Sequence, residues 1–143
     1  MQISKKKYPF CHSGYQYACD VIEKKINVPI AVKGTVKRFF RDLEEKDKFH
    51  FDIDVAERFL RLVQKFHHVK GANWGSKNIT YEPWQNFTFM YLMGFISNET
   101  GRRRFRSAYV QIARGQGKSL LASQIGLYFL ALEGEIGPEV VCA

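Results

Sequence analysis

The chain has 143 residues, 45% of them hydrophobic and 15% aromatic, which is enough apolar surface for one folded core. No apolar run reaches the ~18 residues of a membrane span, and the basic N-terminus lacks the apolar segment of a signal peptide. We therefore expect an intracellular protein that does not bind membranes. The net charge of +8 favours a polyanionic partner such as nucleic acid. The three cysteines lack metal-ligand spacing and are predicted to be free thiols.

The first half of the chain predicts three helices. After a loose lead-in over residues 1–13, Tyr15–Lys25 forms a short helix that Pro29 ends. A second helix is predicted from apolar residues at helical spacing, namely Val32, Val36, Phe39, Phe40 and Leu43. Its other face carries Lys33, Lys37, Arg38 and Arg41. Such a face is typical of a solvated helix surface, and contact with DNA is the alternative.

A third helix is predicted from Val55 to Phe66, with Asp52 or Asp54 as its N-cap. The two histidines at positions 67 and 68 then lie at the helix end, where the dipole favours a cation. The turn-rich residues 70–78 are predicted to form a loop between this helical region and a nucleotide-binding segment.

The next helix opens at Tyr81-Glu82-Pro83-Trp84-Gln85, where a proline suits the first turn. An aromatic stripe at helical spacing predicts a buried face, and it consists of Trp84, Phe87, Tyr91 and Phe95. Gln85 is the exception, because its amide has one acceptor and two donors on a planar end and can pair with adenine. Without context, a glutamine at a helix start is an ordinary surface residue.

Four arginines then precede a predicted buried strand over Ser107–Ala113, and they are Arg102, Arg103, Arg104 and Arg106. They are compatible both with a phosphate-facing turn and with a merely solvated one. After the strand, a glycine-bearing turn leads into a helix that begins at Lys118 and Ser119 and ends near Glu133-Gly134.

A strand that feeds a helix through Gly-x-Gly-Lys-Ser is typical of a phosphate-binding loop, or Walker A motif. Gly115 and Gly117 permit positive φ and close approach of the backbone to an anion, and Lys118 would neutralise phosphates. The Ser119 hydroxyl can ligate Mg²⁺. The generic motif requires a further glycine where this chain has Ile112, so the match is incomplete. A flexible turn with a solvated lysine is the alternative.

Residues 139–143 resemble the start of a second strand. An ATPase of this kind also needs an acidic strand end for Mg²⁺ and a group that positions water. The carboxylates after the loop are Glu133, Glu135 and Glu139, and none ends an apolar strand. We therefore expect the chain to be an N-terminal fragment that is inactive alone.

Four segments together resemble the N-terminal part of the large terminase subunit of tailed bacteriophages, the ATPase that packages viral DNA. They are Tyr17–Ile26, Val36–Glu44, Glu82-Pro83-Trp84-Gln85 and Ala113-Arg114-Gly115-Gln116-Gly117-Lys118-Ser119. The last is similar to the family's variant phosphate-binding loop, which relaxes the first glycine and has an arginine at the position of Arg114.

The resemblance implies a role for each site residue. Lys118 and Arg114 would be catalytic, with Lys118 on the β- and γ-phosphates of ATP and Arg114 near the γ-phosphate. Ser119 would hold Mg²⁺. Nucleotide binding would use Gln85, Trp84, Gly115, Gln116, Gly117, Lys118 and Ser119, with Gln85 reading adenine. The Mg²⁺-binding acidic strand and a metal-dependent endonuclease domain would lie beyond Ala143.

The resemblance also implies that ATP hydrolysis drives translocation of double-stranded DNA into the procapsid, in the cytoplasm of the infected bacterial host. The terminase small subunit, the portal and further copies of the chain would be partners. Two alternatives stay open, a basic helical module that binds DNA or another subunit, and a P-loop NTPase of another class such as a helicase.

The predicted fold class is α/β. Residues 1–78 form a mainly helical N-terminal region, and residues 79–143 begin a P-loop ATPase domain with its first strand–loop–helix unit. The sheet would be incomplete at the C-terminus.

Overall fold

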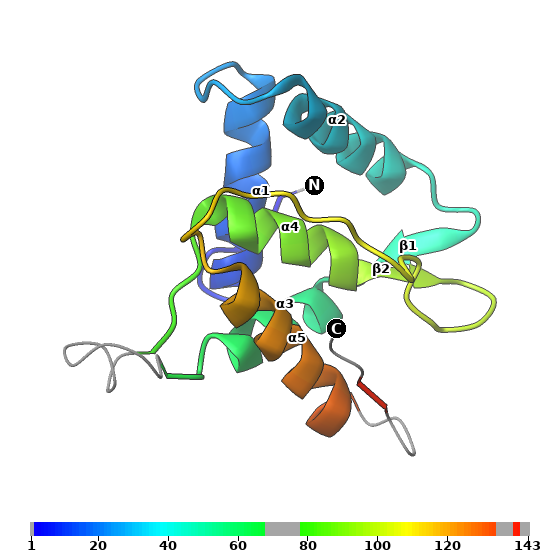
Figure 1. The fold of residues 1–143 in the computed structure, drawn as a ribbon. Coiled ribbons are helices and arrows are strands. Elements are labelled where there is room, and N and C mark those ends of the chain that lie inside the picture. The colour runs from blue at the N-terminus through cyan, green and yellow to red at the C-terminus, as the bar shows by residue number, and fades with distance from the viewer. Residues whose placement is uncertain (1, 68–77, 134–138, 141–143) are drawn as a thin grey trace. The chain divides into compact units, whose positions relative to one another are not determined.

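The computed structural model describes the chain except for residues 1, 68–77, 134–138 and 141–143 (Figure 1). Two compact units are present, one of residues 1–61 with 80–108 and the other of residues 62–79 with 109–143. The elements run in the order α1 (Pro9–Ile22), α2 (Ile30–Glu44), β1 (Phe49–Phe51), α3 (Ile53–Val63), α4 (Pro83–Gly94), β2 (Phe95–Ser97) and α5 (Lys118–Ala131). The fold is thus mainly helical with a small two-stranded sheet. The predicted division into a helical region of residues 1–78 and an ATPase domain from residue 79 stays a prediction.

Helix α1 begins earlier than predicted, so the loose lead-in over residues 1–13 is wrong. Pro9 occupies the first turn, where its missing N–H leaves no unpaired donor. The Glu57 Oε2 of α3 accepts the Cys11 N–H at 2.8 Å, and the Tyr8 hydroxyl donates to Asp54 Oδ1 at 3.0 Å. These carboxylates stabilise the positive end of α1 from residues distant in sequence.

The predicted second and third helices are confirmed as α2 and α3. Asp52 caps α3, because its Oδ1 accepts the N–H groups of Asp54 and Val55, each at 3.0 Å. Helix α3 ends at Val63, so His67 lies beyond it, in an isolated bridge with Asn78. His68 lies outside the described residues.

Helix α4 starts as predicted at Pro83 but ends at Gly94, and Phe95 begins β2. Strands β1 and β2 pair antiparallel, with Phe51 opposite Phe95 and Phe49 opposite Ser97. The predicted aromatic stripe is buried at Phe87, Tyr91 and Phe95, and Trp84 is partly exposed. The helix ends before Phe95 because the backbone of Phe95 pairs with β1. Helical spacing of apolar residues cannot predict such a pairing with a distant segment.

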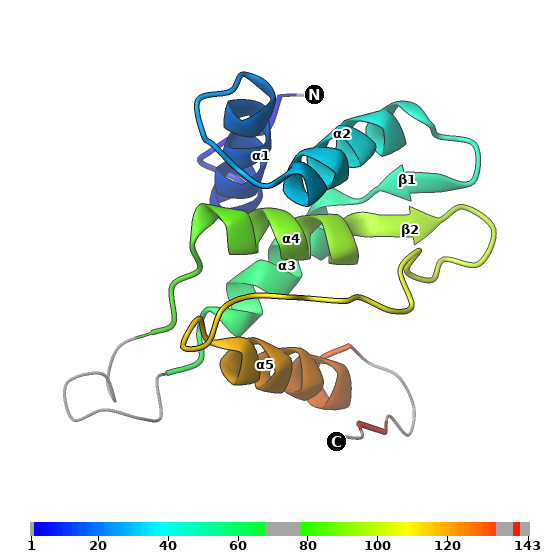
Figure 2. The ribbon, with the colours of Figure 1, turned by 45° about the horizontal axis from the view of Figure 1, so that its top comes forward.

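Phe39 of α2 is fully buried at the centre of the first unit. Aromatic rings surround it, with centroids 5.3–6.5 Å away and mostly edge-to-face, from Tyr15, Phe40, Phe51, Phe87, Tyr91 and Phe95. Helices α1 and α4 cross closely at Gly14, where a Cβ atom would lie 2.7 Å from the backbone nitrogen of Phe87 (Figure 2). Helices α1, α2 and α4 thus enclose one aromatic core.

The second unit contains α5, which begins at Lys118 as predicted and ends at Ala131, before the predicted glycine stop. The Gln124 amide donates to the Val63 carbonyl at 2.7 Å within this unit. The predicted strand over Ser107–Ala113 is wrong, because these residues form no ladder. A strand requires a neighbour for its backbone hydrogen bonds, and none of the described residues pairs with this segment. The predicted second strand falls largely on residues 141–143, outside the described residues.

Candidate functional site

The loop before α5 combines two glycines of positive φ with the N-terminus of a helix. Gly115 and Gly117 have φ angles of 83° and 77°, in the left-handed region that glycine adopts without strain. Gly117 is the N-cap of α5, and its carbonyl accepts the first helical hydrogen bond, from Leu121 N–H at 3.0 Å. The amides of the first turn therefore have no helical acceptor, and the positive end of the helix dipole lies at the loop.

Lys118 folds back over this loop. Its Nζ donates to the Ile112 carbonyl at 2.6 Å and contacts the Ala113 carbonyl at 3.4 Å. The ammonium thus ties the start of the turn to the first residue of α5, and because it is exposed it can turn to a phosphate instead. Arg114 and Ser119 are exposed on the same loop and helix start, so the structure brings the predicted loop residues together.

Gln85 lies in the other unit and takes part in the start of α4. Its Oε1 accepts the Glu82 N–H at 2.8 Å, while the Glu82 side chain caps the helix in return. This capping box fixes the amide with its oxygen toward the backbone, and the Nε2 donors lie at the other end. Gln85 therefore has an ordinary structural role at the start of α4. Its amide still has two N–H donors and one lone pair of Oε1 with which it could bind a ligand.

Trp84 borders a cavity of about 550 Å³ within the first unit. The cavity walls combine flat apolar groups with hydrogen-bonding ones, and they come from α1, the residues around it and the start of α4: Lys5, Pro9, His12, Ser13, Gln16, Tyr17, Asp20, Ile26, Pro83 and Trp84. The cavity thus offers apolar surface beside hydrogen-bonding groups, and Gln85 is not among its lining residues. Sequence reasoning missed His12 and Gln16, because the helix that carries them begins in the segment predicted as a loose lead-in.

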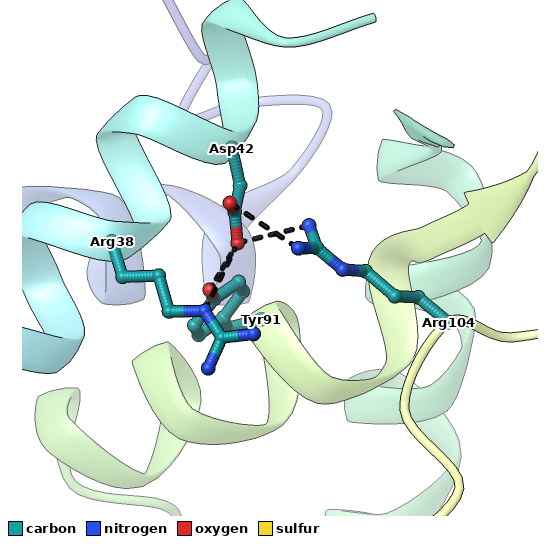
Figure 3. Close-up of polar contacts among 4 residues, drawn as sticks. All are labelled: Arg38, Asp42, Tyr91 and Arg104. Carbon is teal, nitrogen blue, oxygen red and sulfur yellow. Dashed lines mark hydrogen bonds and ion pairs between the residues drawn. The ribbon is translucent and has the colours of Figure 1, made fainter. Parts of the chain in front are cut away.

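A second polar cluster was also missed. Arg104 was predicted to lie in a solvated or phosphate-facing turn, yet it points inward to the buried Asp42 of α2 (Figure 3). Its Nη1 and Nη2 lie 2.9 and 3.3 Å from the two carboxylate oxygens. The Tyr91 hydroxyl donates to Asp42 as well, and Arg38 Nε lies 3.7 Å from it. This cluster fixes the position of the chain just before residues 107–113, and we assign it a structural role.

No group of three potential metal-ligating side chains occurs among the residues that the structure describes. Cys11 and Cys19 are free thiols, as predicted, while Cys142 lies outside the described part. Burial, and then the neighbouring Glu57, raise the pKa of the Cys11 thiol well above its ordinary value. This thiol therefore stays protonated and unreactive at neutral pH.

Residues 83–143 match the family model of the terminase large subunit ATPase domain. This match covers the C-terminal part of the chain and supports the resemblance to a terminase large subunit from Pro83 onward. The match includes Trp84, Gln85 and the whole of the loop before α5. The resembling segments Tyr17–Ile26 and Val36–Glu44 precede it and stay predictions. No curated protein and no solved structure matches the chain.

Within the described residues, no helix has the length and apolar character needed to cross a membrane.

Proposed function

We propose that the chain binds ATP with Mg²⁺ and contributes the phosphate-binding part of a DNA-packaging motor. The observation that carries the proposal is the left-handed Gly117 at the N-terminus of α5, with Lys118 folded over the turn. Backbone amides and the positive end of a helix dipole favour a phosphate at such a terminus, and the nearby Lys118 supports the proposal with a cation. The family match at residues 83–143 supports the terminase ATPase over a helicase.

In this proposal Lys118 leaves the loop carbonyls and binds the β- and γ-phosphates. Gly115, Gln116 and Gly117 supply backbone amides, and the open space beside both glycines leaves room for phosphate oxygens. The exposed Ser119 hydroxyl is an oxygen ligand of the kind that Mg²⁺ prefers, and the bound ion would neutralise charge on the phosphates. Arg114 lies in the turn and would stabilise charge that develops on the γ-phosphate.

Gln85 and Trp84 would hold the adenine. The capping box leaves the Gln85 Nε2 free to donate to adenine N7, while its oxygen keeps a second lone pair for the N6 amine. The cavity beside Trp84 offers aromatic surface on which the base can stack. ATP hydrolysis in the complete protein would then drive double-stranded DNA into the procapsid. The small subunit, the portal and further copies of the chain would be its partners in the cytoplasm of the infected host.

The test is titration of the chain with a fluorescent ATP analogue in the presence of Mg²⁺. We expect Lys118→Ala to weaken binding by at least about tenfold, because an ammonium on two phosphates contributes more than ~1.4 kcal/mol. The matched control is Lys65→Ala, which removes an exposed lysine from the same unit and should leave affinity unchanged. Equal affinity in the Lys118→Ala variant would refute the proposal.

A second variant separates the base from the phosphates. Gln85→Ala should weaken binding of the ATP analogue but leave binding of inorganic triphosphate unchanged. Since the substitution also removes one arm of the capping box, circular dichroism at the same temperature checks that α4 is retained. If both ligands lose affinity equally, Gln85 has no role in reading the base.

A further inference from the structure

Helix α2 carries a line of cations along its outer side. Lys33, Lys37 and Arg41 recur at every fourth residue, so they lie near one another along the helix and about 6 Å apart in rise. Lys37 and Arg41 are exposed and Lys33 is partly exposed. We refer to these three residues as the α2 basic stripe.

The fold holds this stripe outward. The opposite side of α2 contributes Val36 and Phe39, both fully buried, to the aromatic core. Rotation of the helix would expose Phe39 and bury charge, and each of these changes costs several kcal/mol. The stripe is therefore presented on a rigid element and needs no rearrangement to meet a partner.

The residues of the stripe form no ion pair within the described part of the chain, and Lys37 lines a surface hollow together with Glu23. Asp42, the acidic residue next to Arg41, points inward to Arg104 and Tyr91, as Figure 3 shows, and its side chain is 1% exposed. Glu44 is the exposed acid at the C-terminal end of the helix.

Like charges four residues apart repel and destabilise a helix by a few tenths of a kcal/mol for each pair. An external polyanion would turn this repulsion into attraction. Three long side chains in a row at a regular rise suit a partner whose negative charges also recur regularly, and the phosphate backbone of a nucleic acid is such a partner.

We propose that the α2 basic stripe binds the phosphate backbone of duplex DNA, without reading its sequence. The choice of DNA among polyanions rests on the proposed function, whereas the charge argument does not. Lys33, Lys37 and Arg41 would each contact a phosphate, and Arg38, already paired with Asp42, would stay at the edge of the surface. The stripe and the loop before α5 share no residue and belong to different units, so each can be substituted without changing a residue of the other.

The test is binding of the chain to a fluorescent duplex of about 20 bp, measured by anisotropy between about 50 and 200 mM salt. The variant is Lys33→Gln with Lys37→Gln and Arg41→Gln. We expect its affinity at low salt to fall at least about tenfold and the salt slope to fall by roughly 3, near one unit for each phosphate contact.

The charge-matched control is Lys6→Gln with Lys48→Gln and Arg58→Gln, which removes three exposed cations of the same unit. It should bind DNA nearly as the unmodified chain does. Equal weakening in both triple variants would show that only net charge matters, and so would overturn the proposal. Competition by polyglutamate as strong as that by the duplex would overturn it in favour of an acidic protein partner.

The same samples are titrated with the ATP analogue, which the stripe variant should bind with unchanged affinity. Loss of DNA binding in the stripe variant with normal nucleotide binding supports the stripe. Normal DNA binding in the stripe variant refutes it, whatever Lys118→Ala does to nucleotide binding. The two proposals therefore fail independently.

Discussion

The two compact units of the chain differ in how their apolar residues are buried. In the unit of residues 1–61 and 80–108, aromatic rings enclose Phe39 and two buried carboxylates have arginine partners. In the unit of residues 62–79 and 109–143, Tyr109, Leu127 and Leu130 are 88%, 48% and 50% exposed. The first unit owes its conformation to a packed core, whereas the loop of the second is shaped by glycine dihedrals and a helix terminus.

The conformations of the two units therefore depend on different kinds of sequence feature. A packed core depends on contacts between residues distant in sequence, while the loop before α5 depends on local features such as positive φ at Gly115 and Gly117. Helix α5 is apolar on most sides, which is typical of a helix that is covered on more than one face. If the units differ in this way, substitutions in the aromatic core should cost far more stability than substitutions on the exposed side of α5.

The largest effect is expected at Phe39. Phe39→Ala removes a fully buried ring from the aromatic core and should lower the free energy of unfolding by about 3–5 kcal/mol. Leu127→Ala in the second unit should change it by at most about 0.5 kcal/mol, since this leucine is half exposed. Urea unfolding followed by circular dichroism measures both. Similar losses would show that the exposed face of α5 is covered in solution.

Next in size is the buried carboxylate of α2. Asp42→Asn leaves Arg104, whose side chain is 19% exposed, without its counter-charge and should cost about 3 kcal/mol of unfolding free energy. Arg38→Gln is the control within the same cluster, because its side chain is 52% exposed and 3.7 Å from the carboxylate. Because this guanidinium is half exposed and the contact is long, its loss should cost only about 0.5 kcal/mol. If the two variants lose equal stability, burial does not decide the strength of these ion pairs.

Local rules predicted much of this chain from sequence. The position of α2, the start of α5 at Lys118, the start of α4 at Pro83 and the choice of Asp52 as one of two candidate caps follow from apolar spacing and terminal residues. The positive φ at Gly117 follows from the same kind of rule.

The errors have a common physical origin in contacts across the chain. Helix α1 starts at Pro9 because carboxylates of α3 stabilise its first turn, and β2 begins at Phe95 because β1 pairs with it. Arg104 points inward because Asp42 is buried opposite it. The strand predicted over Ser107–Ala113 does not form, because no described residue pairs with its backbone. The same division holds near the candidate site, because the glycine turn before α5 was predicted and the cavity beside Trp84 was missed.

Alkaline pH tests the first unit with a smaller effect. Burial raises the pKa of the Tyr81 hydroxyl above its ordinary value of 10.0. The folded state therefore keeps this proton at a pH where the unfolded state loses it. Below pH 10 this group does not change the free energy of unfolding. Above pH 10 it lowers the free energy of unfolding by about 1.4 kcal/mol for each further pH unit. Tyr81→Phe should unfold less steeply with pH above 10 than the unmodified chain, in urea titrations between pH 8 and about 11. Parallel pH curves would contradict burial of this hydroxyl.

The smallest effect comes from two glycines in neighbouring helices of the first unit. Gly34 in α2 has open space where a Cβ would lie, so Gly34→Ala should stabilise the unit by about 0.5–1 kcal/mol through reduced backbone entropy of the unfolded chain. Gly14→Ala in α1 makes the same chemical change, but there the new Cβ would lie 2.7 Å from the backbone of α4. It should destabilise, because backbone atoms must move apart to accept it. Opposite signs in the measured free energies of unfolding would establish that α1 and α4 pack at van der Waals contact, and equal signs would place the two helices further apart in solution.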